Sequence, residues 1–190
     1  MQTRAETFWL CVRLFLTGCI WAGLFGMLHN QLSYTLSPEY FTEFKFVQFG
    51  LPQGTPLRLG AAWVGWGASW WVGGLIAVGL LSWQMVHLQT PVDAGTNYRA
   101  FRTVLFVSFL SGQLGLLVAE MLLRMGMFDN LQSPLLATFT AAQRSAFIRV
   151  GVMHDASYLG GLLGLLIAAW QLRNRTLQAA SSVQTNQAKS

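Results

Sequence analysis

The stretch LRLGAAWVGWGASWWVGGLIAVGLLSW, residues Leu57 to Trp83, decides the fold class of this chain. It exceeds the roughly 20 apolar residues that an α-helix needs to cross about 30 Å of hydrocarbon. A small residue stands at every fourth position within it: Ala61, Gly65, Ser69, Gly73 and Ala77. Small residues at this spacing let two membrane helices approach backbone to backbone. The stretch therefore predicts a membrane span that packs closely against another span.

Three further runs have the same length and character: Phe8 to Leu32, Phe101 to Met125, and Phe147 to Leu172. Each has its own ladder of small residues, which are Gly18, Ala22 and Gly26; Ser111, Gly115 and Ala119; and Ala156, Gly160, Gly164 and Ala168. We therefore predict an all-α integral membrane four-helix bundle, formed by residues 1–172 as one domain. Residues 173–190 are polar and lack apolar periodicity, which predicts a disordered cytoplasmic tail.

The composition agrees with a membrane protein and argues against nucleic acid as a partner. Of 190 residues, 53% are hydrophobic and 10% are charged, whereas a soluble domain has about 25% charged residues. The net charge of +5 comes from cations at the ends of apolar runs, where they act as topology signals. Their distribution favours cytoplasmic termini. We expect a bacterial inner membrane protein in contact with the lipid bilayer, with a homo-oligomer or a larger membrane complex as the candidate protein assembly.

The two cysteines, Cys11 and Cys19, lie in the first span. Eight residues of helix separate them by about 12 Å, which is too far for a disulfide. The sequence LTGC at Leu16–Cys19 is similar to a lipoprotein processing site, but the apolar run continues beyond it. We therefore expect inert thiols and a first segment that is retained as a span.

The segment LSPEYFTEFKFVQFG, Leu36 to Gly50, connects the first two spans. Ser37 followed by Pro38 is a typical helix start, so we predict a short extracytoplasmic helix here. Its apolar side chains point in nearly all directions, which indicates packing over the outer mouth of the bundle. The carboxylates Glu39 and Glu43 would then be partly desolvated and need partners.

Ionisable residues within spans mark functional sites by default. His29 lies on the small-residue face of the first span, and His154 with Asp155 lies in the outer part of the fourth. Mixed imidazole and carboxylate ligands suit iron, manganese or zinc, and four-helix bundles can hold such sites. We therefore take as candidate metal ligands His29, Glu39, Glu43, His154 and Asp155.

A noncovalent haem b is a second hypothesis, with His29 and His154 as its axial ligands. Structural roles are alternatives for each residue: packing for the histidines, helix capping for Glu39, and an ion pair with Arg149 for Asp155. Glu120 is expected to pair with Arg124 one turn later.

The sequence contains no nucleophile constellation, phosphate-cradling loop or cysteine–histidine metal motif. This favours a non-enzymatic membrane component: an assembly factor, a complex subunit or a small transporter-like unit with a polar His/Glu cluster near its outer face. The alternative is a metal- or haem-binding membrane redox protein that uses the same cluster. Catalytic residues stay unassigned.

Overall fold

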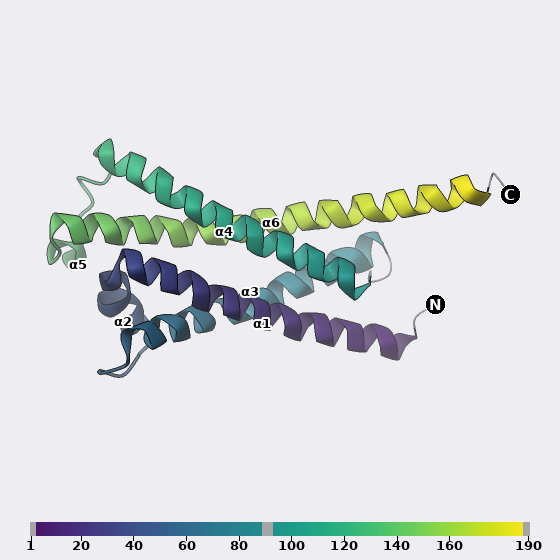
Figure 1. The fold of residues 1–190 in the computed structure, drawn as a ribbon, viewed down its shortest axis with the longest axis horizontal. Coiled ribbons are helices and arrows are strands. Elements are labelled where there is room, and N and C mark those ends of the chain that lie inside the picture. Colours follow the sequence, from purple (N-terminus) through teal and green to yellow (C-terminus); the bar gives the residue numbers. More distant parts are fainter. Residues whose placement is uncertain (1–2, 89–92, 188–190) are drawn as a thin grey trace.

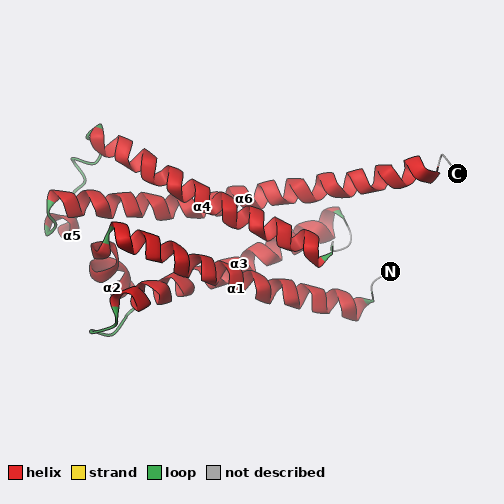
Figure 2. Cartoon of the chain, viewed as in Figure 1, coloured by secondary structure: helices red, strands yellow, loops and turns green. Residues whose placement is uncertain are grey.

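The computed structural model describes residues 3–88 and 93–187, and these residues form helices and connecting turns without a strand (Figure 2). Four long helices dominate: α1 (Arg4–Leu36), α3 (Leu57–His87), α4 (Ala94–Arg124) and α6 (Ala141–Gln187). Three short elements connect them: η1 (Tyr40–Lys45), α2 (Phe46–Gln48) and α5 (Pro134–Ala137). The predicted all-α four-helix bundle is confirmed, and each predicted span coincides with one long helix.

Each long helix contains an apolar stretch that is long enough to cross a membrane. Many large apolar side chains remain exposed on the outside of the bundle, for example Trp63 at 67%, Leu117 at 70% and Leu166 at 69%. A soluble domain would bury most of these groups, whereas lipid tails provide an apolar environment for them. The composition and length of the four helices support an integral membrane protein.

The small-residue ladders bring the helices together in two crossed pairs (Figure 1). In the α1/α3 pair, a Cβ added to Gly26 would clash with the carbonyl oxygen of Gly65. In the α4/α6 pair, a Cβ on Gly115 would lie 2.6 Å from the Cβ of Ala156. These crossings have no room for a larger side chain, so the ladders act as predicted. Longer side chains, such as Leu80 of α3 and Leu172 of α6, make contacts between the two pairs.

The connector between α1 and α3 covers one end of the bundle, which we call the η1 end (Figure 1). The predicted helix start is confirmed, because the Tyr40 amide donates to the Ser37 hydroxyl at 3.3 Å. The helix then widens into a π-helical segment, η1, a form often found at functional sites. Tyr40 and Phe41 are buried against Tyr34, Ala61 and Val150 of the long helices. The connector therefore packs on the bundle, as its apolar residues predicted.

Helix α6 continues to Gln187, beyond the predicted end of the fourth span at Leu172. Residues 173–187 thus extend the helix, where the sequence predicted a disordered tail. No glycine or proline follows Gly164, and alanine, leucine, glutamine and arginine are good helix formers. The rest of the predicted tail, residues 188–190, lies outside the described residues.

Candidate functional site: a buried imidazole pair beside a cavity

His29 of α1 and His154 of α6 meet inside the bundle near the η1 end. Their ring centroids are 5.0 Å apart, and the rings meet edge to face. The two residues are only 7% and 9% exposed. The prediction that both histidines face inward at similar depth agrees with this geometry. The pair joins one helix of each crossed pair.

His154 is held in place through both of its ring nitrogens. Nδ1 lies 2.9 Å from the carbonyl oxygen of Val150, and Nε2 lies 3.2 Å from Oδ1 of Asn30. The orientation of the Asn30 amide is fixed in turn, because its Nδ2 donates to the carbonyl oxygen of Ala61 at 3.0 Å. Both nitrogens of His154 therefore face acceptors. A neutral imidazole can donate to one of them at a time, and a protonated one can donate to both.

His29 is buried differently, because neither of its ring nitrogens has a hydrogen-bond partner among the described residues. Its ring stacks on Phe25 at 5.6 Å between centroids. The buried hydroxyl of Ser157 also lacks a partner within the described part of the chain. A buried polar group without a partner costs about 1–3 kcal/mol, so such groups require an explanation.

The explanation lies next to them: a cavity of about 120 Å³ between α1, α3, α4 and α6. Its polar end is formed by His29, Asn30, His154 and Ser157, together with Lys45 at the η1 end. Away from these residues the lining is mostly apolar, with Ser69 and Ser108 as exceptions, and includes Val72, Ile76, Leu105, Leu162 and Leu165. The cavity is therefore amphipathic along its length.

Tyr40 and Lys45 of η1 cover the polar end of the site. The Tyr40 ring stacks on His154 at 5.0 Å, and burial raises the pKa of its phenol. The Lys45 ammonium donates to Oε1 of Gln48 at 2.9 Å and lies 4.7 Å from the centre of the Phe44 ring. Partial burial lowers the pKa of Lys45, while the charge of Asp155 opposes this effect. The connector thus contributes an aromatic cover and one cation.

The predicted carboxylate ligands do not join the histidines. Glu39 accepts hydrogen bonds from Ser37 at 3.3 Å and from Gln143 at 3.0 Å, so it attaches η1 to α6. Glu43 and Asp155 are exposed. Within residues 3–88 and 93–187, no group of three or more His, Cys, Asp or Glu side chains could hold a metal ion. The structure brings together only the two histidines of the predicted five-residue set.

The haem hypothesis also conflicts with the observed spacing. Axial ligation requires the iron and its macrocycle to lie between the two imidazoles. Here the rings contact each other, and Nε2 of His154 is occupied by Asn30. The two side chains would have to separate before a porphyrin could enter.

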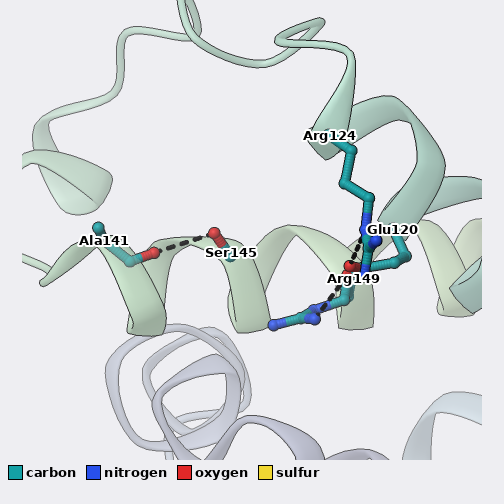
Figure 3. A network of polar contacts seen from close by, with 5 residues as sticks. All are labelled: Glu120, Arg124, Ala141, Ser145 and Arg149. Atoms are coloured by element: carbon teal, nitrogen blue, oxygen red, sulfur yellow. Dashed lines mark hydrogen bonds and ion pairs between the residues drawn. The ribbon is translucent and has the colours of Figure 1, made fainter.

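A separate polar cluster joins α4 to α6 near the η1 end (Figure 3). Glu120 binds Nε of Arg124 and Nη1 of Arg149, both at 2.7 Å. The predicted pairing of Glu120 with Arg124 is confirmed. The alternative role for Asp155 as a partner of Arg149 is not observed, because Glu120 binds that guanidinium.

Sequence reasoning missed Asn30 as a site residue and gave Ser157 no role. Both could have been noticed, because a polar residue adjacent to or one turn from an inward histidine shares its depth in the bundle. Lys45 appeared only as a topology charge. Its place over the site follows from the fold of the connector.

No protein-family model, curated protein or solved structure matches this chain. The fold and the site define the class by themselves: four apolar helices compatible with a small membrane protein, with an amphipathic cavity beside a buried imidazole pair.

Proposed function

We propose that this protein is a non-enzymatic membrane component that holds a small amphiphilic molecule in the cavity between its two helix pairs. The polar head of the ligand lies against His29 and Ser157, and its apolar part extends along the cavity. One observation carries the proposal: a deeply buried histidine that lines the cavity has no hydrogen-bond partner in the described chain for either of its ring nitrogens. A ligand that hydrogen-bonds to them would remove a desolvation cost.

The cavity is open toward the apolar surface of the bundle. Tyr158 and Leu162 both line it and are 50% and 64% exposed. Exposed apolar side chains surround this part of α6, among them Leu159 and Leu166. A ligand dissolved in the bilayer can therefore enter from the side, which suits an amphiphile better than a hydrophilic solute.

The test is to purify the protein in mild detergent, extract it with organic solvent and identify the retained small molecules by mass spectrometry. Two variants alter the site in different ways. His29→Leu removes both unpartnered nitrogens, and Gly161→Leu fills the cavity, because a Cβ at Gly161 meets no atom within 4 Å. His87→Leu is the control, since His87 lies at the opposite end of α3, outside the cavity lining.

We expect one amphiphile in near-stoichiometric amount in the wild-type protein and in His87→Leu. We expect His29→Leu and Gly161→Leu to retain at least tenfold less of this amphiphile. A tenfold change in binding is the size expected from one buried polar contact. Equal retention in all four proteins would contradict the proposal, as would extracts that contain only bulk membrane lipid in bulk proportions.

A metal-binding redox protein is the second candidate, because the ring centroids of two imidazoles from different helices lie 5.0 Å apart, although His154 would first have to release Asn30. Imidazole is a good ligand for zinc, copper and iron. Water or a bound small molecule would have to complete the coordination. Elemental analysis of the same four proteins decides between the candidates, because a metal at this site would be absent from His29→Leu and unaffected in His87→Leu.

A further inference from the structure

Building on the proposed function, we propose that the cavity binds an isoprenoid quinone: an uncharged, planar ring with carbonyl oxygens and a long apolar tail. The polar end of the cavity selects the head, and its apolar length accommodates the tail. Three independent features of the site support this class of ligand.

The first feature is charge. Among the described residues that line the cavity, Lys45 is the single lysine, arginine, aspartate or glutamate. Its ammonium is already bonded to Gln48 and lies over the rings of Tyr40 and Phe44. A phosphate headgroup would call for several cations, and a cationic headgroup for a carboxylate. The described lining offers one cation, which is already bonded, and no carboxylate, so an uncharged headgroup fits best.

The second feature is the hydrogen-bonding capacity of His29 and Ser157. A neutral imidazole has one N–H donor and one bare nitrogen, and a hydroxyl can act in both ways. A quinone carbonyl can therefore accept from His29, while the hydroxyl of the corresponding quinol can donate to the bare nitrogen. Both the quinone and the quinol can therefore form a hydrogen bond with His29 while the imidazole stays neutral.

The third feature is shape. Phe25 stacks on His29, and Tyr40 stacks on His154, so planar rings flank the polar end. Planar groups favour such offset and edge contacts. Along α6, the lining extends from His154 to Leu165, which is about 16 Å of helix at 1.5 Å per residue. The site thus has aromatic rings beside its two histidines and a mostly apolar lining along α6.

The experiment uses decylubiquinone, which has a benzoquinone head and a ten-carbon tail, as the probe, and decylbenzene, which lacks the carbonyls, as its comparison. Binding to full-length protein in nanodiscs is followed by quenching of tryptophan fluorescence and by thermal stabilisation. The variants are His29→Leu, His29→Gln, Gly161→Leu and the control His87→Leu. Thermal melting without ligand shows that each variant is folded.

We expect saturable one-to-one binding of decylubiquinone to the wild-type protein and to His87→Leu. His29→Leu should weaken it about tenfold, since one buried hydrogen bond is lost. His29→Gln retains a donor and an acceptor and should recover part of the affinity, and Gly161→Leu should abolish binding. The affinity for decylbenzene should not depend on His29.

Two results overturn the quinone assignment: decylubiquinone binding no tighter than decylbenzene, or binding with equal affinity to wild type and His29→Leu. If an extracted amphiphile of another class still depends on Gly161 and His29, the proposed function survives and only the quinone assignment falls. If neither probe nor extracted molecule responds to Gly161→Leu, both fall.

Discussion

His29 shows how much a single buried side chain can indicate about function. Its ring could have satisfied one nitrogen with a backbone carbonyl one turn away, as His154 does with Val150. Instead, neither nitrogen has a partner in the described chain, and the residue lines the cavity. An arrangement that costs stability in the free protein is reasonable where a ligand removes the cost.

Asn30 determines the position of the second imidazole, because it bridges the Ala61 carbonyl and His154. Asn30→Leu should destabilise the protein by about 1–3 kcal/mol, since Nε2 of His154 loses its acceptor in a buried site. Reversible unfolding in mixed micelles measures this. In a double-mutant cycle with His154→Leu, the two effects should be non-additive by about 1 kcal/mol. Additive effects would show that the contact contributes nothing.

At the residue scale the sequence predicted part of the site. The periodicity of the small residues placed His29 on the inner face of α1, and the structure agrees. The structure does not gather Glu39, Glu43 and Asp155 around the histidines, because the sequence indicated their position along their own segments but not their direction in the folded bundle. The depth of a residue in the bundle follows from its position along its own helix. The direction of each carboxylate depends instead on how the connector packs on α6, as the hydrogen bond from Gln143 to Glu39 shows.

Three of the helical segments begin with a side-chain cap. Thr3 forms a capping box with Glu6 at the start of α1, Ser37 caps the connector, and Asp93 caps α4 by accepting from the Thr96 amide at 3.0 Å. These motifs depend on a few neighbouring residues and are readable from sequence. The π-helical turn of η1 is not, because packing of Tyr40 and Phe41 on the bundle favours it over a regular α-helical turn.

The cap of α4 predicts a specific dependence of stability on pH. Hydrogen bonds from the side chain and backbone of Thr96 hold the pKa of Asp93 below its ordinary value of 3.8. The carboxylate therefore stabilises the folded state above that value, and the contribution disappears as the pH falls through the folded-state pKa. Asp93→Asn keeps a capping oxygen but does not titrate.

We expect the wild type and Asp93→Asn to differ by about 0.3–1 kcal/mol at neutral pH, with the aspartate more stable. The gap should close as the pH falls below 3.8 and through the lowered folded-state pKa of Asp93, where the carboxylate is protonated. Thermal unfolding of both proteins across this range is the measurement. A constant gap at all pH values would show that the carboxylate charge plays no part in the cap.

At the scale of the whole molecule, the bundle consists of two closely crossed pairs with a cavity between them. The α1/α3 and α4/α6 crossings are backbone contacts made through glycine, alanine and serine. Between the pairs, longer side chains make the contacts. Among them, the ring of His154 meets the ring of His29 and the amide oxygen of Asn30. This division gives the protein two closely packed pairs with a cavity between them.

Two glycine substitutions separate these roles. Gly26→Leu should destabilise the protein by more than about 2 kcal/mol, because its side chain would meet the backbone of Gly65. Gly161→Leu should leave stability unchanged or slightly higher, since the added side chain enters open space. Thermal melting in detergent compares them. Equal effects would contradict the description of the α1/α3 crossing and of the cavity.

The sequence by itself determined the four apolar helices, their small-residue faces and the helix start at Ser37. Hydrophobic length, four-residue periodicity and capping depend on residues within one segment, so no knowledge of the partners is required. The tertiary structure alone decided which ladders pair, that His29 lacks a partner while His154 has two, and that a cavity lies beside them. These properties depend on distances between segments far apart in the chain, such as Asn30 and His154, and such distances are fixed only when the helices pack.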